Sequence, residues 1–406
     1  MSTSTLSEIV EAWGGLIQTG PFGSQLHQYD YSEQGIPVVM PKDIRNGRVD
    51  ESGIARIPEG KASQLSRHFL KAGSVVFPRR GEISKCAYIN EEQAGFLCGT
   101  GCIKIEPPEE KLRSKFLFYF LGLRQSVEWL ERNAVGTTML NLNTKILGGL
   151  KVTLFASKKQ DEIVETLSAY DDLIENNRRR IQLLEKSAQL LYKEWFVHLR
   201  FPGHEHTKII DGVPEGWEKK TAFEVMDVLS GGTPKTTNPS YWDGHIPFFT
   251  PKDATDFAYA HDTEKSITEA GLKNCNSNLY PKDTVFITAR GTVGKINLAQ
   301  CPMAMNQSCY ALVAHPPLNQ HFLYFALVDG VEQFRSRAVG AVFDAIVRDT
   351  FKLIPFVVPD EKLITAFMEH VSPMLAQIDN LSGQVRSLRK ARDLLLPKLM
   401  NGEVAV

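Results

Sequence analysis

Residues 163–195 read IVETLSAYDDLIENNRRRIQLLEKSAQLLYKEW. One set of residues in this stretch is spaced alternately by four and three positions, which is the heptad period of a coiled-coil helix. Its members are Ile163, Leu167, Tyr170, Ile174, Asn177, Ile181, Leu184, Ala188, Leu191 and Trp195. A helix of this length spans roughly 50 Å. It carries one largely apolar stripe, and that stripe has to be buried against a partner.

The same seam recurs 204 residues later, at Phe367, Val371, Met374, Ile378, Leu381, Val385, Leu388, Arg392, Leu395 and Leu399. Two seams in one register predict that the helices pack against each other. The alternative, in which each helix packs only on its own domain, stays open. Pro373 lies inside the second seam and favours a kink, or a helix that restarts there with Ser372 as its N-cap.

The segments that precede the two helices also repeat. Residues 36–43 read IPVVMPKD and residues 246–253 read IPFFTPKD, a shift of 210 residues. The same shift relates FPRRGEISK (77–85) to ITARGTVGK (287–295), and Ala134-Val135-Gly136 recurs as Ala338-Val339-Gly340. A repeat of about two hundred residues is too long for a solenoid unit and fits a domain followed by a connecting helix.

Short apolar runs at residues 36–40, 74–78 and 101–106 alternate with Gly, Pro and Asp turns and predict β-strands. Residues 116–130 and 322–334 have helical spacing. The fold class expected is therefore α+β, with two mixed domains and two long helices.

The expected boundaries divide the chain into five parts. They are a first domain at 1–156, a first helix at 157–200, a linker at 201–213, a second domain at 214–358, and a second helix with the C-terminal tail at 359–406.

Composition limits the classes of function. The chain has 406 residues, 43% of them hydrophobic and 23% charged, and its net charge is −1. No membrane span or signal peptide is recognisable, so we expect a cytoplasmic protein. A protein that holds DNA alone through its phosphates is normally basic, so the net charge argues against an independent, high-affinity DNA binder. Of the six cysteines, Cys98 and Cys102 could share a zinc ion, but buried free thiols are the better interpretation.

Catalytic motifs are not recognisable in the sequence. GTVGK (291–295) lacks the spacing of a phosphate-binding P-loop, and neither a dinucleotide-binding fingerprint nor a metalloprotease or serine-hydrolase motif is present. The proline pairs at 107–108 and 316–317 do not form the Asn/Asp-Pro-Pro-aromatic motif of an amino-group methyltransferase. We therefore expect a chain that is not an enzyme by itself, and no metal site.

The repeated cationic loops are the candidate DNA-binding residues. They comprise Arg79, Arg80 and Lys85 in the first domain, Arg290 and Lys295 in the second, and Lys42 and Lys252 after the repeated strands. Glycine permits close approach of the backbone, and an arginine can bind guanine or phosphate with two parallel hydrogen bonds. The alternative is that these residues are solvated turn tips, and for Lys42 and Lys252 it is the preferred interpretation.

Three further stretches complete a recognisable layout: LEKSAQLLYKEWFVHLRFPG (184–203), PEGWE (214–218) and LRKARDLLLPKLMNGEV (388–404). With the domain–helix–domain–helix order, the chain resembles the specificity subunit of type I restriction-modification systems. The resemblance implies that each domain is a target-recognition domain that reads half of a bipartite DNA target in the major groove. It also implies that the two helices form an antiparallel coiled-coil spacer with pseudo-twofold symmetry.

The resemblance further implies the partners: double-stranded DNA, two modification (methyltransferase) subunits, and restriction/translocase subunits. S-adenosylmethionine, ATP and Mg²⁺ would be bound by those subunits and not by this chain. Two other classes stay open at this point. One is a coiled-coil scaffold without DNA specificity, and the other is a self-contained nuclease or methyltransferase.

Overall fold

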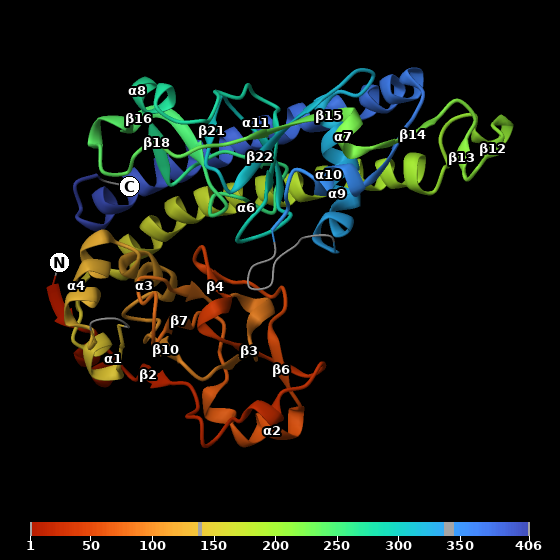
Figure 1. Cartoon of the computed structure of the whole chain (residues 1–406). Coiled ribbons are helices and arrows are strands. Elements are labelled where there is room, and N and C mark those ends of the chain that lie inside the picture. The colour runs from red at the N-terminus through yellow and green to blue at the C-terminus, as the bar shows by residue number, and fades with distance from the viewer. Residues whose placement is uncertain (1, 137–139, 337–344, 405–406) are drawn as a thin grey trace. The chain divides into compact units, whose positions relative to one another are not determined.

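The structure, a computed structural model, describes residues 2–136, 140–336 and 345–404. The repeated tripeptide Ala338-Val339-Gly340 therefore lies outside the described residues. The chain divides into two compact units, and both helical seams are split between them. Unit 1 comprises Met1–Leu173 and Ser387–Val406, and unit 2 comprises Ile174–Arg386. Figure 1 shows the elements of both, coloured along the chain.

Unit 1 is built on an antiparallel sheet in the order β2–β10–β7–β8. Its strands are β2 (Leu16–Thr19), β10 (Cys102–Glu106), β7 (Val75–Pro78) and β8 (Ala87–Tyr88). The other strands are β6 (Ala55–Ile57), β3 (Ile36–Val39) and β9 (Leu97–Cys98) in a smaller sheet, the hairpin of β4 (Ile44–Arg45) and β5 (Arg48–Val49), and the pair β1 (Ser2–Thr5) and β11 (Lys151–Leu154). The helices of the domain are α1 (Leu6–Trp13), α2 (Glu59–Gln64), α3 (Ser114–Leu121), α4 (Arg124–Asn133) and α5 (Thr144–Gly148).

The central strand β7 explains how the domain core forms. All four of its residues are buried, so the strand has apolar neighbours on both faces. Phe77 lies in the cluster that contains Phe116 of α3, whereas Val76 lies in a second cluster with Val39 of β3. The sheet is therefore covered by helices on one side and by the smaller sheet on the other.

Unit 2 repeats this arrangement. Its main sheet has the order β15–β22–β19–β20–β17, and a smaller sheet has the order β18–β16–β21. The strands are β15 (Met226–Ser230), β22 (Cys309–Ala314), β19 (Val285–Thr288), β20 (Ile296–Ala299), β17 (Tyr259–Ala260), β18 (Lys265–Ile267), β16 (Trp242–Phe249) and β21 (Ala304–Met305). The remaining elements are the pairs β12 (Ile209–Ile210) with β13 (Val213–Pro214) and β14 (Glu218–Thr221) with β23 (Pro355–Val358), and the helices α7 (Ala222–Val225), α8 (Glu269–Lys273), α9 (Gln320–Ser336) and α10 (Thr350–Leu353).

The correspondence extends to individual strand pairings. β10 lies between β2 and β7, as β22 lies between β15 and β19. In the smaller sheets, β9 runs parallel to β3 and β21 runs parallel to β16. Cys102 and Cys309 occupy the first position of equivalent strands. The predicted duplication is therefore a duplication of topology as well as of sequence.

The two seams form the long helices α6 (Ser157–Tyr192) and α11 (Glu361–Met400), and α6 continues into a π-helical turn at Lys193–Val197. In unit 1, Asp171 Oδ1 of α6 lies 2.6 Å from Arg392 Nη1 of α11. In unit 2, Asn177 Nδ2 donates to Gln384 Oε1 at 3.1 Å, and the rings of Trp195 and Phe367 are 6.0 Å apart. Residue numbers rise along one helix as they fall along the other. The helices therefore pair antiparallel in each unit, and the predicted fold class is confirmed.

The seam residues differ in how deeply they are buried. Those buried in the two units are Ile163, Leu167, Ile174, Asn177, Ile181, Ala188, Trp195, Phe367, Val371, Ile378, Leu381, Val385 and Leu399. Leu184, Leu191, Leu388 and Leu395 are half-buried. Each unit also packs its helical segments on its domain: Ile163 and Leu167 belong to the core that contains Phe116, and Lys282 Nζ lies 2.6 Å from Asp379 of α11 in unit 2. The helices therefore pack on each other and on the domains.

One prediction about the helices is wrong. Pro373 neither starts nor interrupts α11, which begins at Glu361 and is continuous through the proline. Phe367 and Val371, both fully buried, hold the turns before it, and their burial offsets the hydrogen bond that a proline cannot donate. Residues 116–130 are helical, as their spacing predicted, and they form two helices, α3 and α4, because the chain turns at Gly122-Leu123. The predicted domain boundaries stay predictions.

None of the helices in the described part of the chain is both long and apolar enough to cross a membrane.

Candidate nucleic-acid interface

The repeated cationic loops lie at the same edge of the two main sheets. In unit 1, β2 and β7 end where β10 begins, because β10 is antiparallel to both. The segments beyond these strand ends are therefore neighbours: the N–H of Arg79 donates to Gly101 O at 2.6 Å, and that of Gly20 donates to Cys102 O at 2.9 Å. We call this edge the loop edge of unit 1. The loop edge of unit 2 is the equivalent one, where β15 and β19 end and β22 begins.

A tight turn presents one arginine at each loop edge. Gly81 and Gly291 have φ values of 84° and 82°, in the left-handed region that glycine adopts without strain. The residue before each glycine is exposed: Arg80 in unit 1 and Arg290 in unit 2. In unit 1, the side chain of Ile83, two residues after Gly81, is buried in the domain core and anchors the loop there. The glycine thus forms the turn, and the arginine side chain points away from the core.

The predicted arginines have no carboxylate partner among the described residues. No ion pair joins Arg80 or Arg290 to any carboxylate of the described residues. Arg79 is half-buried, and its guanidinium carbon lies 5.4 Å from the ring centroid of Phe22, which is 52% exposed. Such a cation–π contact orients the guanidinium without neutralising it. All three can still bind an anion or a base edge.

The predicted lysines are placed differently. Lys85 pairs with Glu82, Lys295 pairs with Asp256, and Lys252 Nζ lies 3.7 Å from Glu264. A lysine that already faces a carboxylate gains less from a phosphate, because the first pair has to be broken. Lys42 is exposed and forms no ion pair with any described carboxylate. These lysines therefore differ in their availability to bind an anion: Lys42 is more available than the three that face carboxylates.

The repeated Pro-Lys-Asp sequence has a structural reason. Asp43 and Asp253 are buried although both have ionisable side chains. Asp43 Oδ2 accepts the N–H of Met40 at 2.9 Å, and Asp253 Oδ2 accepts the N–H of Thr250 at 2.8 Å. Burial raises the pKa of Asp43 above its usual value. The aspartate closes the turn after β3 and β16, so the repeat of these residues reflects chain geometry as well as any binding role.

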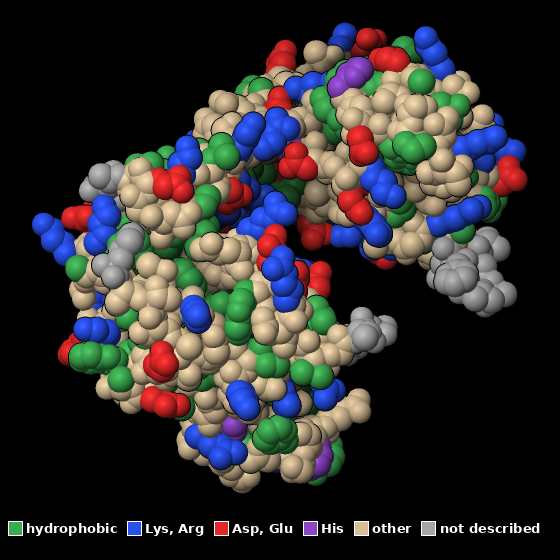
Figure 2. Space-filling model, turned by 90° about the vertical axis from the view of Figure 1, so that its left-hand side faces the viewer, with side chains coloured by type: hydrophobic (Ala, Val, Ile, Leu, Met, Phe, Trp, Pro, Cys, Tyr) green, Lys and Arg blue, Asp and Glu red, His purple; other side chains and the backbone are tan. Residues whose placement is uncertain are grey.

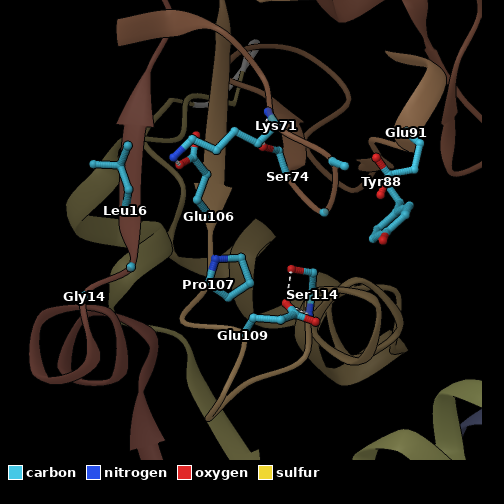
Figure 3. Close-up of a pocket in the computed structure, with 13 residues that line it drawn as sticks. Gly14, Leu16, Lys71, Ser74, Tyr88, Glu91, Glu106, Pro107, Glu109 and Ser114 are labelled. Atoms are coloured by element: carbon cyan, nitrogen blue, oxygen red, sulfur yellow. Dashed lines mark hydrogen bonds and ion pairs between the residues drawn. The ribbon is translucent and has the colours of Figure 1, made fainter. Parts of the chain in front are cut away.

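The opposite edge of the unit 1 sheet has the other sign of charge. A pocket of about 400 Å³ lies there, where β2 begins and β10 ends (Figure 3). Glu106 lies 3.0 Å from Lys71, and Glu109 accepts the N–H and the hydroxyl of Ser114 at 2.9 and 2.6 Å. Glu91 also lines this pocket. Glu106 also pairs with Lys104, whereas Glu91 and Glu109 have no ion-pair partner among the described residues, so this edge is less favourable for an anionic polymer than the loop edge.

The surface as a whole is of mixed charge. Figure 2 shows Lys and Arg side chains interspersed with acidic ones on the face that it draws. Within the described residues, no group of three or more His, Cys, Asp or Glu is placed to hold a metal ion. Cys98 and Cys102 are buried free thiols, and burial raises the pKa of Cys98 to about 12, which disfavours the thiolate that zinc binds.

Sequence reasoning missed the aromatic and polar residues of the loop edges, notably Phe22, Trp242 and Asn306. A recess of about 390 Å³ beside Arg290 is lined by the last two. A search for repeats finds what the two copies share. These residues differ between the copies, and only the aromatic character of Phe22 and Trp242 could have drawn attention to them.

Comparison with known proteins assigns the family. The chain matches the family described as type I restriction modification DNA specificity domain twice, over residues 3–186 and 214–380. These two matches cover most of the chain, which therefore belongs to this family. The predicted resemblance is confirmed.

Individual relatives agree with this assignment. The MjaIX specificity subunit of Methanocaldococcus jannaschii is 24% identical over 389 residues, covering 93% of this chain and 88% of the relative. The HindI specificity subunit of Haemophilus influenzae is 20% identical, covering 89% and 93%. The crystal structure of a type I restriction-modification S subunit from M. genitalium has a TM-score of 0.55 and 20% identity, with 98% and 95% covered. The last likeness supports the fold.

Proposed function

We propose that the chain is the specificity subunit that selects a bipartite DNA target, with one half-site read at each loop edge. The observation that carries this proposal is the match between the two edges. Equivalent strands end in equivalent turns, and each turn places an arginine without a carboxylate partner among the described residues. Two similar reading edges in one chain suit a target with two separate halves.

Base contact at these edges follows from the chemistry of arginine. A guanidinium can donate two parallel hydrogen bonds to O6 and N7 of guanine in the major groove, or to two phosphate oxygens. The aromatic and polar residues around each arginine differ between the units, which suits half-sites of different sequence. The scaffold without DNA specificity is not favoured, because both copies match a DNA specificity domain.

Catalysis belongs to partner chains in this proposal. Two modification subunits would bind S-adenosylmethionine and methylate adenine, and restriction/translocase subunits would use ATP and Mg²⁺. The net charge of −1 suits a chain that shares phosphate contacts with such partners. The long helices would set the unread gap between the half-sites, since a 36-residue helix such as α6 spans roughly 54 Å and one turn of B-DNA about 34 Å.

The test uses Arg80→Ala and Arg290→Ala in the complex with the modification subunits. Each substitution should weaken binding by about 1–3 kcal/mol, the contribution of a good two-bond contact to a base. Each should also relax specificity in one half-site only, as measured with duplexes in which one half-site at a time is varied. Arg124→Ala is a matched control, because Arg124 is exposed on α4 and is paired with Glu128.

Three outcomes decide the question. Loss confined to one half-site for each variant supports the proposal. Equal loss on target and random DNA would mean that the arginines contact phosphate only. No loss for either variant, or a footprint with a single protected patch, would contradict the assignment of one half-site to each loop edge.

A further inference from the structure

The recess at the loop edge of unit 2 has the size of a ligand site. Its volume of about 390 Å³ lies within the range of roughly 300–1,000 Å³ that is typical of pockets for small molecules. Trp242 and Phe248 form an apolar wall, and Arg290 stands at the mouth beside Asn306 and Ser308. A flat protein–DNA contact does not need a hollow of this kind.

The aromatic wall is held rigid. The Nε1–H of Trp242 donates to Lys235 O at 3.3 Å, and the indole meets the ring of Phe248 edge-on, with centroids 5.5 Å apart and planes at 87°. Phe248 is buried within β16, so it cannot move aside. The indole ring is therefore fixed before any ligand arrives, as stacking requires.

The mouth of the recess is cationic, and two side chains beside the aromatic wall carry donor groups without a hydrogen-bond partner among the described residues. Lys252, Lys265 and Arg290 line it with only one carboxylate, Glu264. Lys265 Nζ lies 5.6 Å from the centroid of the Trp242 ring. Within the described part of the chain, no hydrogen-bond partner is found for the side-chain NH₂ of Asn306 or for the Ser308 hydroxyl, although Asn306 Oδ1 accepts the N–H of Ser308 at 3.0 Å.

In unit 1, described residues fill the equivalent position. The strand pairs β3–β9 and β16–β21 match Met40 to Thr250 and Gly99 to Asn306. A Cβ added to Gly99 would lie 2.5 Å from Met40 Sδ, so the methionine packs directly on the glycine. Met40 also contacts Tyr31 and belongs to an apolar cluster. A filled site in one copy and an open site in the other indicate that the opening is specific to the second half-site.

We propose that this recess binds one nucleobase that is displaced from the duplex, with Trp242 as the stacking platform and with the backbone phosphate of that nucleotide at the cationic mouth. The inference rests on the proposed function and extends it. An intact base pair presents only its edge in the groove and cannot reach a wall inside a hollow. The sugar-phosphate backbone of an intact duplex could bind the cations but would not contact the aromatic wall. A single displaced base has an aromatic face that can stack on Trp242 and an edge that can form hydrogen bonds with Asn306 and Ser308. Its backbone phosphate is negative and can bind the cations at the mouth.

The experiment is a mismatch scan of the second half-site, carried out with the complex of the chain and its modification subunits. Each pair is mismatched in turn by changing the opposite strand, and each base is separately replaced by an abasic site. For a base bound in the recess, the two changes should alter the affinity of the complex in opposite directions. Its mismatch should tighten binding on the order of tenfold, because unpairing is already complete, and its removal should weaken binding. The base that the modification subunits methylate is mapped first and left out of the scan.

Three variants assign the response to the recess. Trp242→Ala should weaken binding roughly 5- to 150-fold and abolish the mismatch effect, because a stacking platform is lost. Thr250→Met combined with Asn306→Gly should do the same by filling the recess as in unit 1. Asp253 keeps its bond to the N–H of residue 250 in that variant, so the turn should remain. Trp13→Ala, which removes an exposed tryptophan of α1, is the control and should change nothing.

The outcomes separate the two proposals. The recess does not hold a base if, outside the methylated base, no position shows tighter binding with a mismatch and weaker binding with an abasic site. The same holds if the variant with Thr250→Met and Asn306→Gly keeps the mismatch effect. In either case, half-site reading by Arg290 can still be correct. If neither arginine variant alters its half-site, the proposed function fails, whatever the scan shows. An opposite response in the first half-site as well would also contradict the inference, because unit 1 has its equivalent position filled.

Discussion

Glu185 should make the stability of the chain depend on pH. This carboxyl belongs to α6, and its Oε1 accepts the N–H of Ala258, in the domain of unit 2, at 2.5 Å. Buried Tyr324 is near enough for the carboxylate to affect it. Burial raises the pKa of Glu185 to about 7, and the hydrogen bond from Ala258 only partly offsets this. Between about pH 4.5 and pH 7, the folded chain therefore holds a proton on Glu185 that the unfolded chain has released.

The sign and size of the effect follow from proton linkage. Because the folded state binds more protons, the free energy of unfolding falls as pH rises. The fall begins near the ordinary pKa of about 4.5 and is complete above about 7. At about 1.4 kcal/mol for each pKa unit, the full loss is up to about 3 kcal/mol. Glutamine has the same shape and can accept the same hydrogen bond without ionising, so Glu185→Gln should remove this loss.

Urea unfolding of Glu185→Gln and of the unsubstituted chain at pH 5 and pH 8 measures the effect. The two chains should differ little at pH 5, and the variant should be more stable by about 2–3 kcal/mol at pH 8. Glu165→Gln, an exposed position on the same helix, is the control and should change neither value. A variant that is less stable at pH 8 would refute the reasoning, because it would show that the carboxylate is favourably bound. A gain of equal size at both pH values would also refute it, because it would show that the gain does not come from removing an ionisable group.

Three other substitutions test the helices and the loop edges. Leu167→Ala should cost about 3 kcal/mol in urea unfolding, since Leu167 is fully buried in the core shared by α6 and the first domain; a cost below about 1 kcal/mol would argue against that packing. Asp256→Asn should free Lys295 and steepen the dependence of log K on log salt by about one, whereas an unchanged slope would place Lys295 away from phosphate. Insertion of one heptad after Ile174 in α6 and one after Leu388 in α11 keeps the antiparallel partners in register and adds about 10 Å, so the tolerated gap between half-sites should grow by about three base pairs. A gap of unchanged length in methylation mapping would remove the spacing role of the helices.

The heptad period predicted the helices well because it depends on local spacing alone. A strict three-four alternation over more than four heptads has few interpretations besides a long helix with one buried stripe. Pro373 shows where local rules fail. In isolation it favours a helix start, but the upstream turn is stabilised by buried Phe367 and Val371, which only the packed structure reveals.

The candidate site could be predicted only in part. Repeated Arg-Gly pairs identified Arg80 and Arg290, and both are presented at equivalent loop edges. The lysines of the same motifs were indistinguishable from them in sequence, yet Lys85 and Lys295 face carboxylates in the folded chain. Glu82 is near in sequence to its lysine, but Asp256 reaches Lys295 only because β17 and β20 pair.

The sequence by itself determined that this chain holds two copies of one domain, each followed by a heptad helix, because periodicity and repetition are properties of residue order. Tertiary structure decided which of the described cationic side chains face a carboxylate, and that the second copy has a recess where described residues of the first copy fill the equivalent position. The physical reason is that ion pairing and cavity filling depend on residues brought together from distant segments. Met40 on Gly99 closes one site, whereas Thr250 and Asn306 leave the other open.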